Sequence, residues 1–65
     1  MLSPRQKECL QRIAAGETSI EIGAALGLSP RTIDTYVHAA CRRLAVRTRA
    51  QAVAKSIKLG LIVLD

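Results

Sequence analysis

The sequence predicts an all-α fold, a four-helix bundle that contains a helix-turn-helix, and three observations lead to this prediction. Helix-start signals recur at four places, glycines follow most of the segments they open, and no segment alternates polar and apolar residues as a strand does. A chain of 65 residues forms one small domain at most. Tyr36 is its single aromatic residue, so the core must be aliphatic.

Each helix start carries a hydroxyl side chain that can accept a hydrogen bond from a first-turn amide. Three of these hydroxyl residues are followed by Gln or Glu at capping-box spacing: Ser3 with Gln6, Thr18 with Glu21, and Thr48 with Gln51. The fourth, Ser29, precedes a proline, which is favoured at the first helical position. Three glycines suit left-handed helix ends: Gly16, Gly27 and Gly60. The predicted helices span about 4–15, 19–26, 30–44 and 49–59.

The link between the second and third helices is only "GLS", from Gly27 to Ser29. A short link that holds a glycine, with Leu28 free to point inward, is typical of a helix-turn-helix. A plain helical hairpin is the alternative. Gly23 is expected where the two helices approach closely, although glycine weakens a helix by up to about 1 kcal/mol relative to alanine.

The third helix separates its residues into two faces at about 100° per residue. The expected core stripe comprises Ile33, Tyr36, Val37, Ala40 and Leu44, with Cys41 at its border. The opposite arc is polar and comprises Arg31, Asp34, Thr35, His38 and Arg42. Such side chains can donate to guanine, accept from cytosine, or contact a thymine methyl group. An ordinary solvated face is the alternative, but such faces favour Glu and Lys, and this arc has neither.

The charge distribution points to an anionic partner. The net charge is +5, and seven of the ten basic residues lie from Arg31 onward, where Asp34 is the only acid before Asp65. A basic half predicts binding to nucleic acid or an anionic membrane surface. Candidate phosphate-binding residues flank the polar arc: Thr18, Ser19, Ser29, Thr32, Arg43, Arg47 and Arg49.

A metal site is a weaker interpretation of the same stretch. His38 and Cys41 are three residues apart and Cys9 lies elsewhere, but structural zinc sites need about four ligands. The two cysteines are expected to be buried, unpaired thiols. We expect no metal, no cofactor and no catalytic site, because the chain lacks paired carboxylates, a glycine-rich phosphate loop and a nucleophile beside a base. No apolar run approaches the roughly 20 residues of a membrane span, which predicts a cytoplasmic protein.

The fourth helix offers two apolar stripes. Ala50, Val53, Ala54 and Ile57 are expected to pack on the core. Ala52, Ser56 and Leu59 form a second stripe, which we expect to pair with a second copy across a two-fold axis. Incidental exposure of small residues is the alternative.

In their order and spacing, several motifs resemble the LuxR-type (GerE-like) helix-turn-helix family of bacterial transcription regulators. They are "LSPRQKECL", Gly16, "TSIEIGAALGLSPRTI", "RRLAVRTRAQAV" and the final "LGLI". Gly23 stands where the family commonly has Ala, and Ala45 where it often has Gly. The resemblance implies a DNA-binding domain over 1–65, the C-terminal part of a larger regulator.

The family resemblance also implies how the domain works. The third helix would enter the major groove, with Arg31, Asp34, Thr35, His38 and Arg42 at DNA-contacting positions, and the fourth helix would form a homodimer. "GETSIEI" and "QAVAKSIKLGLI" look most like the quorum-sensing subgroup with a lactone-binding domain. A two-component response regulator and an anti-activator that only pairs with proteins are the alternatives. RNA polymerase would be a further partner of such a regulator.

Overall fold

The computed structural model describes residues 1–64 and contains four helices: α1 (Pro4–Ala14), α2 (Ser19–Leu26), α3 (Pro30–Leu44) and α4 (Arg49–Lys58). Every boundary lies within one residue of its predicted position. The described residues contain no strand. The all-α prediction is therefore confirmed.

The helix starts follow the sequence signals closely. In all three predicted capping boxes the hydroxyl accepts from the third-residue amide, and the Gln or Glu side chain accepts from the cap amide. Ser29 caps α3 by accepting from the Thr32 amide at 3.1 Å. Gly16, Gly27 and Gly60 all have positive φ, as predicted from their places after the helices.

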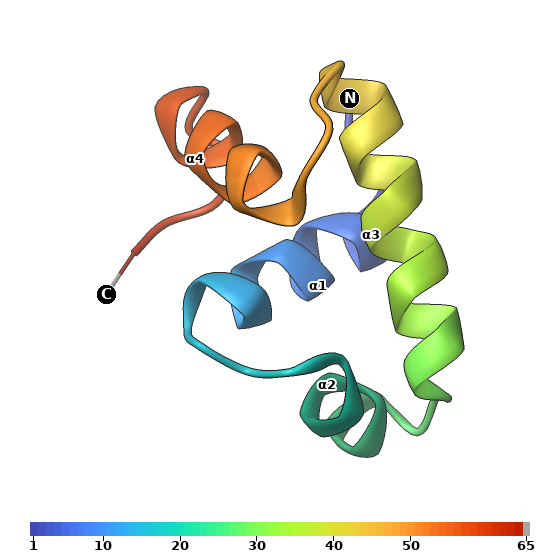
Figure 1. Ribbon diagram of the computed structural model, residues 1–65. Helices are drawn as coiled ribbons and strands as arrows, with labels where there is room; N and C mark the ends of the chain where they lie inside the picture. The colour runs from blue at the N-terminus through green and yellow to red at the C-terminus, as the bar shows by residue number, and fades with distance from the viewer. Residues whose placement is uncertain (65) are drawn as a thin grey trace.

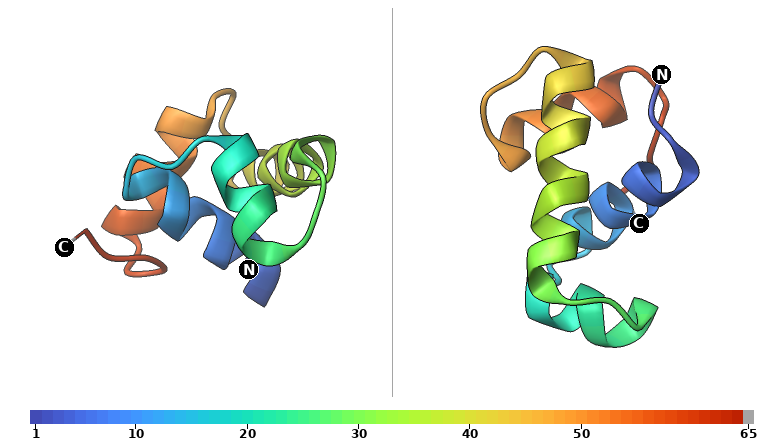
Figure 2. Two further views of the ribbon diagram at one scale, coloured as in Figure 1. Left: turned by 90° about the horizontal axis from the view of Figure 1, so that it is seen from below. Right: turned by 90° about the vertical axis from the view of Figure 1, so that its right-hand side faces the viewer.

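The longest helix, α3, runs along one side of the molecule (Figure 1). α1 crosses behind its middle, while α2 and α4 pack toward its opposite ends. In the view from the right in Figure 2, α3 lies in front of the other helices. One long face of α3 is thus turned away from the rest of the chain.

The core lies where α1 and α3 meet, and each of the other helices adds side chains to it. Its fully buried residues include Leu10 of α1, Ile22 of α2, Ile33 of α3 and Ala52 of α4. Four of the five residues of the predicted α3 stripe are buried and Tyr36 is half-buried. Cys9 and Cys41 are both buried in this core as free thiols.

The helix-turn-helix is closed by backbone contacts around Gly23. The Leu28 amide donates to the Gly23 carbonyl at 2.8 Å. A methyl group on Gly23 would lie 2.4 Å from the Leu28 carbonyl oxygen, well inside contact distance. The close approach predicted at Gly23 is therefore present, and its partner is the backbone of the turn.

α3 ends at a residue other than glycine whose backbone nevertheless has the left-handed conformation usual for glycine. Ala45 has φ 58°, in the left-handed region that costs a residue with a side chain about 1 kcal/mol or more. The Val46 amide donates to the Cys41 carbonyl at 3.0 Å, which completes the helix end. Lys55 of α4 donates to the Leu44 carbonyl at 2.7 Å, placing a cation at the negative end of α3.

The predicted faces of α4 are wrong in part: Val53 and Ile57, assigned to the core, pack against it as expected. Ala52 and Ser56, assigned to a dimer surface, have no exposed area because they pack into the chain's own core. Ala50 and Ala54, assigned to the core, are exposed. Only Leu59 of the predicted dimer stripe is at the surface, with 56% of its area exposed. The error arises because small residues occur on both faces, so hydrophobicity alone could not orient the helix.

The C-terminal segment is fixed to α1. The Gln11 side chain accepts from the Val63 amide at 3.1 Å and donates to the Val63 carbonyl. Ile62, beside it, is buried in the core. These contacts place the segment that follows α4, up to Leu64, beside α1 (Figure 2).

Candidate nucleic-acid interface

The outward face of α3 carries the predicted base-contacting residues, and all of them are exposed: Arg31, Asp34, Thr35, His38 and Arg42. Ser29 and Pro30 fix where the helix begins, and the burial of Ile33 and Val37 fixes its rotation. The geometry agrees with the two faces counted from the sequence.

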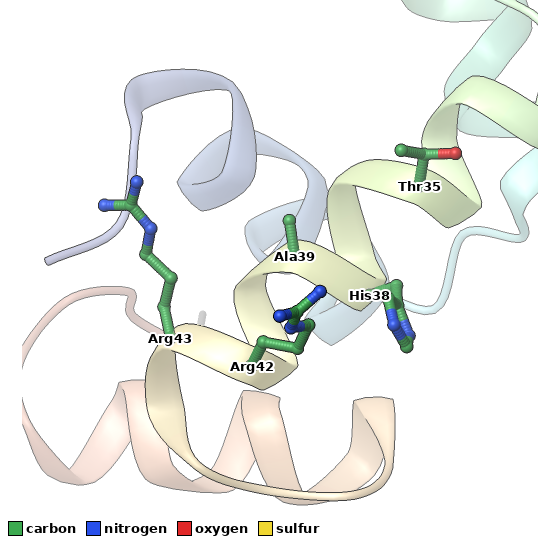
Figure 3. Close-up of a pocket in the computed structure, with 5 residues that line it drawn as sticks. All are labelled: Thr35, His38, Ala39, Arg42 and Arg43. Atoms are coloured by element: carbon green, nitrogen blue, oxygen red, sulfur yellow. The ribbon is translucent and has the colours of Figure 1, made fainter.

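Part of this face forms a shallow groove, shown in Figure 3. Its lining residues are Thr35, His38, Ala39, Arg42 and Arg43. The Thr35 hydroxyl donates to the Arg31 carbonyl at 3.0 Å, which leaves its methyl group available for an apolar contact such as a thymine methyl. Ala39 was missed by the sequence reasoning because an alanine carries no polar signal.

The hydroxyl residues proposed for phosphates also cap helices. Thr18 accepts from the Glu21 amide at 3.2 Å, and Ser29 accepts from the Thr32 amide. The Ser29 and Thr32 hydroxyls lie 2.9 Å apart. Because the amide donates to a lone pair of the hydroxyl oxygen, the Thr18 O–H remains free to donate to a phosphate at the start of α2. At the start of α3 one of the two O–H groups of Ser29 and Thr32 remains free in the same way.

The arginines after the middle of α3 differ in their surroundings. Arg43 donates from Nη1 to the Met1 carbonyl at 2.6 Å, so its side chain turns toward the N-terminal segment, as Figure 3 shows. Arg47 is exposed in the link to α4, where its backbone amide donates to Gln51 Oε1 at 2.8 Å. Arg47 therefore lies on a fixed backbone with an accessible guanidinium.

Asp34 lies in a cluster formed by three helices. Its Oδ1 accepts from the Ser19 hydroxyl of α2 at 2.5 Å and from Arg49 Nη2 of α4 at 3.1 Å. Arg49 Nη1 also donates to the Ser19 hydroxyl at 3.2 Å. The hydrogen bond from Ser19, and then that from Arg49, hold the pKa of the Asp34 carboxyl below its usual range. The sequence reasoning found all three residues but not their contact.

The structure separates the residues of the metal interpretation. His38 is exposed on the outward face of α3, whereas Cys9 and Cys41 are buried in the core. Among residues 1–64, no three His, Cys, Asp or Glu side chains gather closely enough to hold an ion. The stretch from Ser29 to Leu44 therefore has a buried apolar face and an exposed polar face.

The family described as "Bacterial regulatory proteins, luxR family" matches residues 1–56. The chain belongs to this LuxR family. A solved structure described as the transcription factor GerE superposes with a TM-score of 0.94 at 26% identity, covering 98% of this chain and 96% of that one. The chain is thus a LuxR-type DNA-binding domain of a transcription regulator. Its family is one of transcription regulators and not of enzymes.

Two relatives illustrate the range of the LuxR family. The quorum sensing-dependent transcriptional regulator RpaR of Rhodopseudomonas palustris is 43% identical over 61 residues, 94% of this chain and 25% of RpaR. The "Probable transcriptional regulatory protein NarL" of Mycobacterium tuberculosis is 39% identical over 62 residues, 95% of this chain and 29% of NarL. The chain spans about a quarter of the length of such relatives. None of the four helices is long and apolar enough to cross a bilayer.

Proposed function

We propose that this domain binds double-stranded DNA sequence-specifically as a dimer, with α3 in the major groove, to regulate transcription. The observation that carries the proposal is the outward face of α3, where Arg31, Thr35, His38 and Arg42 lie exposed along one side of a helix that the other three helices support from behind. A helix presented in this way fits the width of the major groove.

Backbone contacts would surround this face. Arg47 and Arg49 lie before and at the start of α4, and Ser29 and Thr32 lie at the start of α3. Contacts of this kind fix register on the duplex without reading bases, and they release counterions. Binding should therefore weaken steeply as salt rises.

Dimerisation is proposed through the exposed face of α4. Gln51, Ala54, Lys55, Lys58 and Leu59 line a shallow, largely apolar depression there. Ala54 is small enough to let two copies of α4 approach closely across a two-fold axis. The half-sites of the operator would then lie about one helical turn, or 10 base pairs, apart.

The larger setting of the domain is also proposed. Its likeness to RpaR supports the output domain of a quorum-sensing regulator, as the C-terminal part of a longer chain. Its likeness to NarL keeps the output domain of a response regulator as the second candidate. An anti-activator is less well supported, because it would need no clustered Arg31, Thr35, His38 and Arg42.

Selection of binding sites from randomised duplexes, with the chain at low salt, tests the DNA-binding proposal. We expect an enriched motif with two-fold symmetry. In the same assay His38→Ala should change the preferred base at one position of each half-site, since the imidazole would contact a base edge. Arg47→Ala should weaken binding to all duplexes by a similar factor.

Lys7→Ala is the matched control for Arg47→Ala, because it removes one exposed positive charge from α1, outside the proposed interface. Binding of this variant should fall less than that of Arg47→Ala. Recovery of unenriched sequence from several rounds of selection would contradict sequence-specific binding.

A further inference from the structure

Asp34 differs from the other polar residues of α3 in what it contacts. Its Oδ1 accepts two hydrogen bonds, from the Ser19 hydroxyl of α2 and the Arg49 guanidinium of α4. At about 100° per residue, Asp34 also lies at the edge of the polar arc, next to buried Cys41. It does not line the groove formed by Thr35, His38 and Arg42. Its carboxylate is directed toward neighbouring helices.

Arg49 lies at a position where its positive charge is unfavourable unless a negative group compensates for it. It is the first residue of α4, at the positive end of the helix dipole, where a cation is disfavoured. Asp34 supplies the compensating charge at 3.1 Å, and Ser19 accepts a second hydrogen bond at 3.2 Å. The side chains of Arg49 and Asp34 remain 44% and 55% exposed, so the guanidinium is accessible to a ligand.

The Arg49 guanidinium is hydrogen-bonded to Asp34 and Ser19 but still has N–H groups that can donate to another acceptor. A guanidinium carries five N–H donors, and the cluster uses two of them. A long arginine side chain loses rotamer entropy when it binds, and a side chain already fixed by Asp34 and Ser19 loses less of it. Arg49 is thereby prepared for a phosphate oxygen beside the starts of α2 and α4.

We infer that Asp34 is a positioning residue that holds Arg49 for the DNA backbone, and that it does not read bases. The inference rests on the proposed function, since it concerns how the same interface binds DNA. It replaces base contact by Asp34 with an indirect role and leaves base selection to Arg31, Thr35, His38 and Arg42.

The test is a double-mutant cycle of Asp34→Ala and Arg49→Ala, measured as the Kd for the selected duplex and for a scrambled one. Removing an acid near DNA should by itself tighten binding, because it lowers charge repulsion. If Asp34 positions Arg49, Asp34→Ala instead weakens binding to both duplexes, about 3- to 10-fold. In the Arg49→Ala background the same change no longer weakens binding.

Two further measurements separate positioning from a general loss of fold. Asp34→Ala and Arg49→Ala should each lower the slope of log Kd against log salt by about one, the signature of one lost phosphate contact. Asp34→Glu, which keeps the charge, should restore most of the affinity. Glu8→Ala is the matched control: it breaks another exposed Arg–carboxylate pair, Arg5–Glu8 at 3.0 Å, and should not weaken binding.

A changed base preference in Asp34→Ala, or tighter binding of this variant with Arg49 intact, would overturn the inference. Either result would leave the proposed function standing, because the unaltered chain would still select a motif. Absence of any selected motif from the unaltered chain would count against the proposed function instead.

Discussion

At the level of single residues, Gly23 fixes the geometry of the helix-turn-helix. Gly23→Ala should lower the free energy of unfolding by about 1–3 kcal/mol, because the new methyl group would overlap the Leu28 carbonyl oxygen and a backbone atom cannot move away cheaply. Alanine's better helix propensity, worth about 1 kcal/mol, acts in the opposite direction and is included in this range. Urea denaturation followed by circular dichroism measures the change.

Ala25→Gly is a suitable comparison for Gly23→Ala. Ala25 is exposed on the same helix, so this variant should lose only the propensity difference of about 1 kcal/mol. A Gly23→Ala variant more stable than the original chain would show that the turn relaxes without cost.

Ala45 presents the opposite case, a non-glycine residue with left-handed backbone. Ala45→Gly should raise the free energy of unfolding by about 0.5–1 kcal/mol, because relief of left-handed strain exceeds the added entropy of the unfolded chain. Its side chain is exposed, so little packing is lost. Thermal denaturation should give a higher Tm. An unchanged or lower Tm would indicate that the strain is already relieved in other ways.

At the level of the helices, the two faces of α4 should respond differently to the same substitution. Ala54→Gln enlarges an exposed side chain at the proposed dimer contact without changing charge. It should raise the Kd for a duplex with two half-sites while leaving a single half-site unaffected. Titration of both duplexes measures this, and equal weakening on both would argue against pairing through this face.

Ala52→Gln is the matched control on the other face. Ala52 is fully buried, so this change places a large amide in the core and should reduce stability by several kcal/mol. The sequence analysis assigned Ala52 to the dimer surface, where the same change would weaken dimerisation and leave the fold intact. Circular dichroism of the two variants, at equal concentration, distinguishes misfolding from dissociation.

The helices were predictable because their signals are local. Ser3, Thr18, Ser29 and Thr48 each cap the helix that follows, within three residues of the amide they bind. The rotation of α3 was also predictable, since large aliphatic residues contrast with charged ones. The rotation of α4 was not, because alanines lie on both of its faces and only packing against α1 and α3 distinguishes them.

At the level of the whole molecule, both thiols should be protected by the fold. Cys9 has no exposed area and Cys41 is 7% exposed. Burial, and next the charge of Glu8, raises the pKa of the Cys9 thiol, so the reactive thiolate is disfavoured at neutral pH. Alkylation should therefore be slow in the native chain and should accelerate in denaturant, as mass spectrometry would show.

The free energy of unfolding should also decrease as the pH becomes alkaline. The raised pKa of the Cys9 thiol means that the folded state disfavours the thiolate. The contribution of the neutral thiol is therefore present below the unfolded-state pKa and is lost as pH rises through the folded-state value.

Fast labelling of either cysteine at pH 7 without denaturant would contradict the predicted slow alkylation and would show that the core opens readily.

The candidate site was predictable only in part from the sequence. The exposure of Arg31, Thr35, His38 and Arg42 follows from the period of one helix. The contact of Asp34 with Ser19 and Arg49 joins residues 15 and 30 positions apart and depends on how three helices pack. Sequence periodicity holds no information on such contacts, so it grouped Asp34 with the predicted base-contacting residues without revealing its contacts with Ser19 and Arg49.

The contact between Gly23 and the Leu28 carbonyl has a consequence for how this domain can evolve. Since main-chain atoms set the spacing of α2 and the turn, exchanges of core side chains that conserve volume should leave the start of α3 in place. In the proposed binding mode, changes on the outward face of α3 should likewise alter the preferred operator without affecting the core. We therefore expect substitutions in this chain to change its thermal stability and its preferred operator independently of each other.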